Sequence, residues 1–220
     1  MDFRELMSYC RDLEANNNRT WFHDNHARYE RVKADFEEYL ELLRFVISDA
    51  APALSDDIMF MPVKSWTYRI ARDMRYYKDR PPYNPSFRAY ISRDKKSWLP
   101  IGYFLRLAPD DSVFGTGVWC EDTASTNRVR DYISAHFFEL RSLLDESGVE
   151  LCGDRLRRAP RGFDEADPAI EYIKYKYWML MIPIPQSVAE SETHLTEFIG
   201  NAARRLEPLR LFFLRAAEGD

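Results

Sequence analysis

Cysteine is scarce in this 220-residue sequence, and the placement of its three cysteines excludes two kinds of site. Cys10, Cys120 and Cys152 lie far apart, and none belongs to a Cys-x-x-Cys pair. A disulfide framework and a cysteine-based zinc site both need regularly spaced cysteines. We therefore expect three reduced thiols that pack as small apolar side chains.

The sequence also lacks a long apolar run. Its most apolar stretch, YWMLMIPIP at residues 177–185, is interrupted by two prolines and is far shorter than the roughly 20 residues that cross a bilayer. The opening stretch MDFRELMSYCRDLE carries charges throughout, unlike a secretory signal. We expect a cytosolic protein that does not enter a membrane.

The signatures of several enzyme classes are missing too. There is no GxSxG, P-loop or kinase motif, and GTG at residues 115–117 lacks the third glycine and the following helix of a dinucleotide fingerprint. We expect these glycines to let a helix or a ligand pack close to a sheet. His23 and His26 have a spacing that suits a metal on one helical turn, but no third ligand follows, and we expect Asp24 to begin a helix instead. The sequence therefore predicts no metal and no cofactor.

What the sequence does contain is regular apolar patterning. Hydrophobic residues make up 45% of it, enough for a substantial core, and no linker or repeat divides it, so we expect one α+β domain over residues 1–220. Apolar residues at helical spacing predict several helices. These cover residues 3–13, about 24 to the DAAPAL stretch at 49–54, 127–147 with Gly148 as the stop, a segment capped by Asp167 and Pro168, and about 190–214.

Between residues 64 and 119 the apolar period changes to two. Alternation begins at Trp66 and returns in SFRAYIS, GYFLRL and SVFGTGVW, which predicts four strands, and a further strand is expected at residues 178–184. The links PPYNP, RDKKS and APDDS are too short for crossover helices, so the strands should be antiparallel. The predicted fold is α+β, with a central, mainly antiparallel sheet and helices from both ends of the chain packed on it.

Charge is unevenly distributed along the chain. The whole sequence carries a net charge of -5, yet residues 64–106 contain eleven basic and three acidic residues, or +8, which leaves -13 for the rest. An overall acidic protein does not coat nucleic acid or anionic membrane with its whole surface. Any anion should therefore bind locally, within the basic segment.

The densest part of that segment is RDMRYYKDRPPYN at residues 72–84. If a strand from Trp66 continued through it, Arg69, Asp73 and Arg75 would point to one side while Arg72 and Lys78 pointed to the other. The carboxylate could hold one guanidinium and leave the other for an anion. A solvated surface loop is the alternative.

Further candidate ligands surround this cluster. Tyr83 offers a hydroxyl or a ring face, whereas Asp79, like Asp73, should anchor a neighbouring cation, because carboxylates among arginines have lowered pKa values. A second cluster, LRRAPRGFD at residues 156–164, presents Arg161 between Pro160 and Gly162 in a non-helical turn, or is a plain surface turn.

Five segments resemble a family found mainly in bacteria, the domain of unknown function 2461 family. They are NNNRTWF, YRIARDMRYYKDRPPYN, the glycine pair of FGTGVW, LRRAPRGFD and IKYKYW. The resemblance implies a shared site but names no reaction. Its pattern matches at Arg72, Asp73, Arg75, Lys78, Asp79, Pro82, Tyr83, Arg161, Gly162 and Lys176, and departs at Arg80 and Asn84, where the family more often has lysine.

Our main hypothesis is a protein that binds a small anionic or phosphate-bearing ligand in a basic, aromatic-lined cleft, as an enzyme or as a binding protein. The alternatives are local nucleic-acid binding, with Trp98 and tyrosines stacking on bases and the RDKKS lysines on phosphate, or a scaffold for an acidic partner. The oligomeric state stays open. We further predict that Arg161 and Lys176 meet residues 72–80 around a single cleft.

Overall fold

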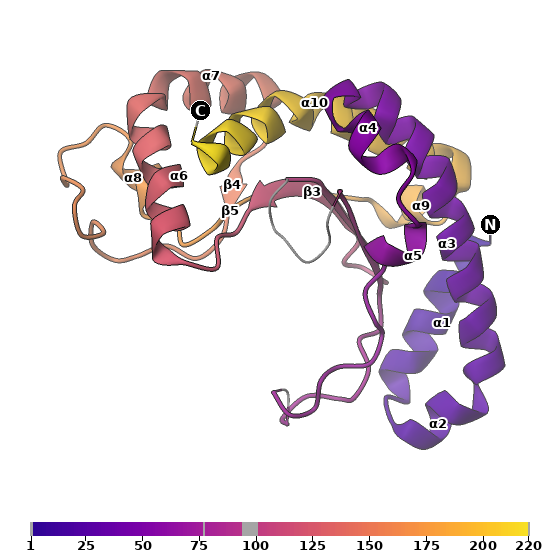
Figure 1. The fold of residues 1–220 in the computed structure, drawn as a ribbon. Coiled ribbons are helices and arrows are strands. Elements are labelled where there is room, and N and C mark those ends of the chain that lie inside the picture. The colour runs from indigo at the N-terminus through magenta and orange to yellow at the C-terminus, as the bar shows by residue number, and fades with distance from the viewer. Residues whose placement is uncertain (1, 77, 94–100, 220) are drawn as a thin grey trace.

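A computed structural model describes residues 2–76, 78–93 and 101–219. The described chain forms one sheet and a set of helices (Figure 1). The helices are α1 (Phe3–Ala15), α2 (Arg19–Asp24), α3 (His26–Ala50), α4 (Pro52–Met59), α5 (Val63–Trp66), α6 (Thr123–Ala135), α7 (Phe137–Ser147), α8 (Ile170–Ile173), α9 (Gln186–Ala189) and α10 (Glu192–Glu218). The strands are β1 (Phe87–Ile91), β2 (Tyr103–Leu107), β3 (Val113–Val118), β4 (Leu151–Cys152) and β5 (Trp178–Pro183).

The sheet is antiparallel throughout, with the order β1-β2-β3-β5-β4. The predicted α+β class and antiparallel arrangement are confirmed. Strands β1, β2 and β3 follow one another in sequence and in space, as their short connections require. Strand β5 then returns beside β3, and the short β4 forms the far edge.

The strand expected from Trp66 is not present. Residues up to Trp66 form the short helix α5. Thr67 then forms an isolated bridge with Ala89 of β1, and Ala71 forms one with Tyr83, which lies outside the strands. The physical reason lies in the opposite segment, where prolines at 81, 82 and 85 have no N–H to donate, so a continuous ladder cannot form.

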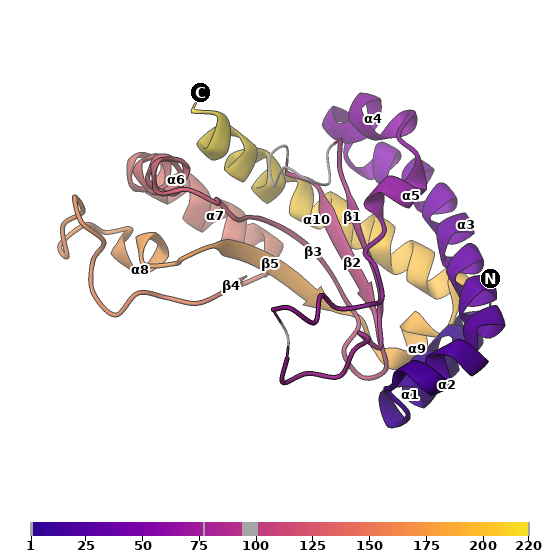
Figure 2. The ribbon, with the colours of Figure 1, turned by 60° about the horizontal axis from the view of Figure 1, so that its bottom comes forward.

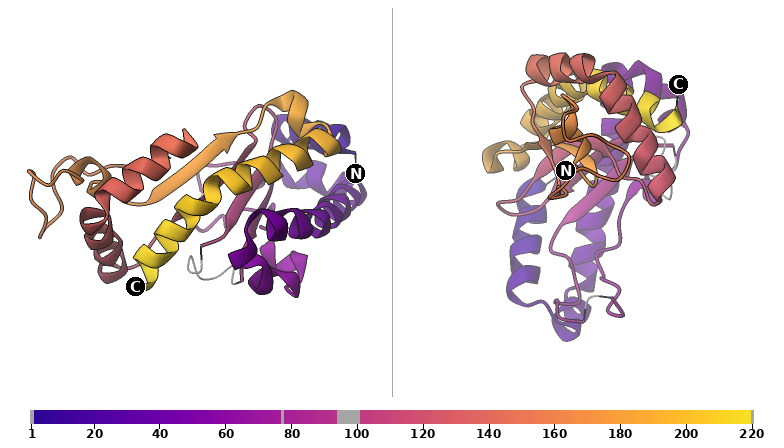
Figure 3. Two further views of the ribbon diagram at one scale, coloured as in Figure 1. Left: turned by 90° about the horizontal axis from the view of Figure 1, so that it is seen from above. Right: turned by 90° about the vertical axis from the view of Figure 1, so that its left-hand side faces the viewer.

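Helices cover one face of the sheet. In Figure 3, α10 crosses the sheet diagonally, packing against β3, while α3, α6, α7 and α9 pack around it (Figures 1 and 3). On this face the Tyr103 hydroxyl donates to Glu207 at 2.7 Å, and Glu207 in turn holds the buried Arg210 through two hydrogen bonds of 2.6 and 2.7 Å. Arg210 also donates to Ile101 O at 2.9 Å, which leaves this buried charge well compensated.

The strand register places a second set of residues on the opposite face. Tyr90 pairs with Phe104, Phe104 with Gly115, and Gly115 with Met181, so all four lie on the side away from α10. Within the described residues no helix lies over this face, which Figure 2 shows from below. Residues 72–76 and 78–84 extend below the sheet in Figure 1, near its β1 edge.

The glycine pair of β3 has a different use from the one expected. A Cβ on Gly115 would lie 2.2 Å from Leu180 O, and one on Gly117 would lie 2.3 Å from Trp178 O. The close neighbour is therefore strand β5, and no helix of the described chain is among the nearest atoms.

Several helix boundaries differ from the expected ones. The helix predicted at 127–147 is two helices, α6 and α7, interrupted at His136, whose ring stacks on Tyr132 with 4.1 Å between centroids; Gly148 ends α7 in the left-handed conformation, as predicted. The helix expected from Asp167 is reduced to the single turn α8, and Asp167 accepts a hydrogen bond from the Ala169 amide ahead of it. Helices α2 and α4 were not expected.

Candidate functional site

The basic cluster is carried by a hairpin, described over residues 71–76 and 78–84, that extends from the β1 edge of the sheet. Its two arms are joined at the base, where the Arg72 amide donates to Pro82 O and the Asn84 amide donates to Ile70 O, each at 2.8 Å. The Arg72 side chain closes the same base, because its Nη1 donates to Pro81 O at 2.8 Å and to Tyr83 O. Arg72 thus holds the two arms of the hairpin together.

The turn between α1 and α2 fixes the hairpin from the side. The Asn17 side chain donates to Tyr83 O and accepts from the Tyr83 amide, both at 3.0 Å, so one side-chain amide satisfies both backbone groups of one residue. The Tyr83 ring also stacks on Phe22, with 4.1 Å between ring centroids. We predicted Tyr83 as a ligand contact, but in the structure it joins the hairpin to the α1–α2 turn and to α2.

The first turn of the hairpin is built by Asp73. Its carboxylate accepts from the Arg75 amide at 3.0 Å and from Arg75 Nε and Nη2 at 2.9 and 2.6 Å. These hydrogen bonds from Arg75 hold the pKa of the Asp73 carboxyl below its ordinary value. The predicted pairing of Asp73 with a cluster cation is confirmed, and it makes Asp73 an anchor.

A pocket of about 490 Å³ opens at the base of the hairpin, and we call it the basic pocket. Four guanidinium groups line it against a single described carboxylate, that of Asp73, which is already bonded to Arg75. The described lining residues are Tyr68, Arg69, Ala71, Arg72, Asp73, Arg80, Asn84 and Arg88.

Two contacts order the wall of the basic pocket nearest the sheet. Arg88 of β1 donates from Nη2 to Arg69 O at 3.0 Å, and its guanidinium lies 5.3 Å from the centre of the Tyr68 ring. Arg88 is therefore held in place by contacts within the protein. Among the described residues the Arg69 guanidinium makes no hydrogen bond or ion pair.

Sequence reasoning did not single out Tyr68, Ala71 and Arg88, and it treated Arg80 and Asn84 as the weaker members of the proposed site. Tyr68 and Arg88 come together because Thr67 bridges to Ala89 of β1 and the Tyr68 amide donates to Arg88 O at 3.0 Å, a pairing that sequence patterning does not reveal. Arg80 and Asn84 line the pocket although they depart from the expected family pattern. The basic count between residues 64 and 106 was the signal that could have included Arg80 and Arg88.

Six predicted ligands do not line the basic pocket: Tyr83, three other residues of the hairpin, and Arg161 and Lys176. Arg75, Lys78 and Asp79 are exposed on the hairpin, and Arg75 is engaged by Asp73. The expected contact between Asp79 and a cation is absent from the part of the chain that the structure describes. Lys78 and Arg80 are the sequence neighbours of Asp79, but the side chains of consecutive residues do not face each other.

Arg161 and Lys176 belong to a different region. Arg161 lies in a turn closed by the Phe163 amide donating to Pro160 O at 3.1 Å, and Gly162 takes the positive φ of 95° that this turn requires. Lys176 lies 3.6 Å from Asp154, at the base of the same loop.

The predicted meeting of the two clusters is wrong. Thr67, in the segment that leads into the hairpin, bridges to Ala89 of β1, whereas the loop of residues 153–176 joins β4 and β5 at the other edge of the sheet. Four strand spacings separate these edges, or about 19 Å. Figures 1 and 2 show the two segments far apart, so Arg161 and Lys176 do not complete the basic pocket.

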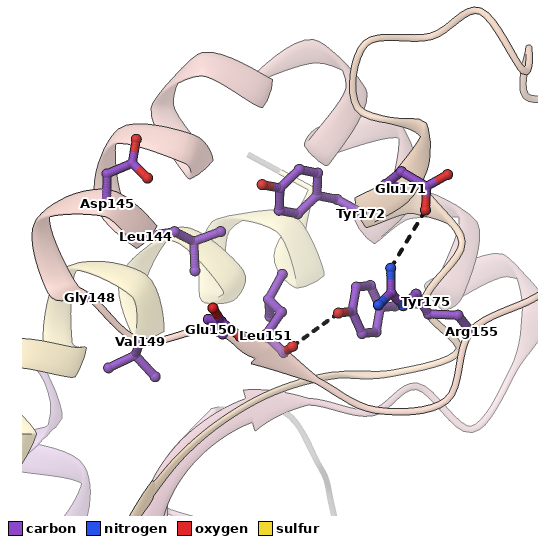
Figure 4. Close-up of a pocket in the computed structure, with 10 residues that line it drawn as sticks. All are labelled: Leu144, Asp145, Gly148, Val149, Glu150, Leu151, Arg155, Glu171, Tyr172 and Tyr175. Atoms are coloured by element: carbon purple, nitrogen blue, oxygen red, sulfur yellow. Dashed lines mark hydrogen bonds and ion pairs between the residues drawn. The ribbon is translucent and has the colours of Figure 1, made fainter.

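A pocket near the second cluster has the opposite charge. It lies between the end of α7, residues 148–151 and α8, and Figure 4 shows Asp145, Glu150 and Glu171 around it with Arg155 as its one described cation. Arg155 lies 3.5 Å from Glu171 and is thus already compensated. This acidic pocket does not suit an anion.

Other sequence candidates give no site. His23 lies in α2, whereas His26 is the first residue of α3. The described residues contain no group of three potential metal ligands. Asp24 is the last residue of α2 and does not begin α3, which takes Asn25 as its N-cap. All three cysteines are free thiols.

Trp98 and the lysines of RDKKS, the candidates for nucleic-acid binding, lie outside the described residues. No helix of the described chain is long and apolar enough to span a bilayer.

A family model described as a conserved hypothetical protein, DUF2461, matches residues 5–212. The chain belongs to the DUF2461 family. No curated protein and no solved structure matches it. The structure adds that two of the segments that carried the resemblance to DUF2461, NNNRTWF and YRIARDMRYYKDRPPYN, are in direct contact through Asn17, Phe22 and Tyr83.

Proposed function

We propose that the basic pocket binds a small anionic ligand, with a phosphate group as the group it suits best. The observation that carries the proposal is the composition of the pocket: Arg69, Arg72, Arg80 and Arg88 line it, and its one described carboxylate is bonded to Arg75. Like charges held together cost free energy unless an anion compensates them. A bound phosphate would supply that compensation.

The side-chain chemistry also favours phosphate. A guanidinium is planar and presents paired N–H donors, which match two oxygens of a phosphate or carboxylate. A volume of about 490 Å³ lies within the range of small-molecule sites. The pocket therefore suits a phosphate attached to a small organic group.

The described lining residues point to binding more than to proton transfer. Asp73 is the one described carboxylate, and its lowered pKa makes it a poor base near neutral pH. An electrostatic role for the arginines in a reaction is compatible with the same arrangement.

Calorimetric titration and thermal unfolding with ribose 5-phosphate test the proposal. At about 100 times its Kd the ligand should add roughly 2.7 kcal/mol to the free energy of unfolding. The double variant Arg69→Gln, Arg80→Gln should weaken binding at least tenfold, since charge-assisted hydrogen bonds contribute about 1.5–3 kcal/mol each.

The matched control is Arg161→Gln, because Arg161 is an exposed arginine at the other end of the sheet. It should leave the affinity unchanged. Absence of binding, or equal affinity in the double variant and the native protein, would overturn the proposed function.

A further inference from the structure

A second pocket, of about 480 Å³, adjoins the basic pocket. It lies between α3 and residues 64–71, and it shares Tyr68, Arg69 and Ala71 with the basic pocket. We call it the ring pocket. Its lining residues are Phe22, His26, Tyr29, Lys33, Glu37, Lys64, Thr67, Tyr68, Arg69, Ile70 and Ala71.

The ring pocket differs from the basic pocket in its chemistry. Four ring side chains line it, and three of them form a cluster in which Phe22 lies 5.2 Å from Tyr29 and 5.8 Å from His26 between ring centroids. The fourth, Tyr68, comes from the opposite wall. Such a lining suits a flat ring, because aromatic rings stack on one another with little dependence on the identity of the ring.

Polar groups stand at the edge of the ring pocket. The Glu37 carboxylate is only 14% exposed and lies 4.0 Å from both Lys33 and Lys64. The carboxylate can accept a hydrogen bond from an amino group, and the two ammonium groups can donate to ring nitrogens or carbonyl oxygens. A heteroaromatic base carries groups of both kinds on its edge.

Arg69 connects the two pockets. It lines both, and within the described residues its guanidinium makes no hydrogen bond or ion pair. A ligand that fills the two pockets together must join a flat ring to an anionic group across this residue. The linker between the two groups would pass Tyr68, Arg69 and Ala71, all of which line both pockets.

We propose that the two adjoining pockets bind a mononucleotide, with its base in the ring pocket and its phosphate in the basic pocket. This inference rests on the proposed function, because it places the phosphate among the arginines named there. It adds the class of ligand: a phosphate ester that carries a heteroaromatic base.

Titration calorimetry with matched ligands tests the inference. Adenosine monophosphate and uridine monophosphate are compared with ribose 5-phosphate, which lacks the base, and with adenosine, which lacks the phosphate. At least one nucleotide should bind about tenfold more tightly than ribose 5-phosphate, as expected for one stacked base.

Two variants separate the contributions. His26→Ala should weaken nucleotide binding severalfold and leave ribose 5-phosphate binding unchanged, whereas Arg69→Gln should weaken both. His194→Ala, at an exposed histidine of α10, is the control and should change neither. Tyr68→Leu is the second ring-pocket variant, and the melting temperature of each variant shows whether it has folded.

The outcomes distinguish the two proposals. If ribose 5-phosphate binds and neither nucleotide binds more tightly, the mononucleotide inference is wrong and the anion site stands. If neither ribose 5-phosphate nor a nucleotide binds, both proposals fail. Adenosine that binds as tightly as its monophosphate would also overturn the inference.

Discussion

Arg69 and Arg72 are three residues apart and line the same pocket, but their side chains do different things. Arg72 donates to the carbonyls of Pro81 and Tyr83 and so joins the two arms of the hairpin. Arg69 makes no such contact among the described residues. Sequence alone identified both as basic candidates and could not separate them, since the distinction depends on which carbonyl oxygens the folded hairpin brings within reach.

Replacing Arg72 by alanine tests its structural role. The variant should lose about 1–2 kcal/mol of unfolding free energy, because two carbonyls lose a charged donor. Hydrogen exchange should accelerate at the amides of Arg72 and Asn84, which bond across the hairpin base. Arg75→Ala is the control, since Arg75 is 82% exposed and bonds only to Asp73 within the described chain. Equal exchange rates in the two variants would contradict the assignment.

Tyr90 gives a prediction for pH dependence. Burial raises the pKa of Tyr90 to about 12, above the value of about 10 in an unfolded chain. Between these values the unfolded chain has lost the phenol proton and the folded chain keeps it. The free energy of unfolding should therefore fall as the pH rises above 10, by up to about 1.4 kcal/mol per unit from this residue.

The variant Tyr90→Phe should make that decline shallower between pH 10 and 12. At neutral pH it should cost about 1 kcal/mol, because the Gly102 amide loses the Tyr90 hydroxyl as its acceptor. Chemical denaturation at a series of pH values measures both effects. Parallel curves for the native protein and the variant above pH 10 would exclude this role of Tyr90.

At the scale of elements, the sequence predicted strands β1, β2, β3 and β5 and helices α1, α3 and α10 well. Their apolar residues recur at the period that each element requires. The strand that alternating side chains suggested is absent from residues 66–76, and residue 77, where that prediction ended, lies outside the described residues. The prolines of the opposite arm prevent a continuous ladder of hydrogen bonds there. Local patterning does not reveal that this proline-containing arm is the partner of residues 71 and 72.

The contact between the α1–α2 turn and the hairpin can be tested at Asn17. Asn17→Ala removes two hydrogen bonds to the Tyr83 backbone and should lower the free energy of unfolding by about 1–2 kcal/mol. Trypsin should then cleave faster within the hairpin, which offers Arg72, Arg75 and Lys78; Arg80 precedes Pro81 and is not a trypsin site.

Asn16→Ala is the matched control for this experiment. The Asn16 side chain donates to Asp12 O at the end of its own helix, at 2.9 Å, and does not reach the hairpin in the described structure. Its cleavage rate should stay near that of the native protein. Equal rates for the two variants would show that the Asn17 contact does not hold the hairpin.

At the scale of the whole molecule, sheet order decides what the site contains. The sequence correctly indicated one strongly basic segment, but it predicted that Arg161 would join it. That error arises because β5 inserts beside β3 and places β4 at the far edge, so the loop with Arg161 leaves the sheet on the side opposite to the hairpin. Long-range strand order of this kind is not encoded in local periodicity.

The most direct test of the anion site is a crystal of the protein soaked in tungstate, a tetrahedral anion whose position anomalous scattering reveals. We predict a tungstate ion in the basic pocket, within hydrogen-bond distance of Arg69 and Arg80 and displaced by added phosphate. Tungstate bound near Arg161, or elsewhere on the surface, with the basic pocket free of it would contradict the account.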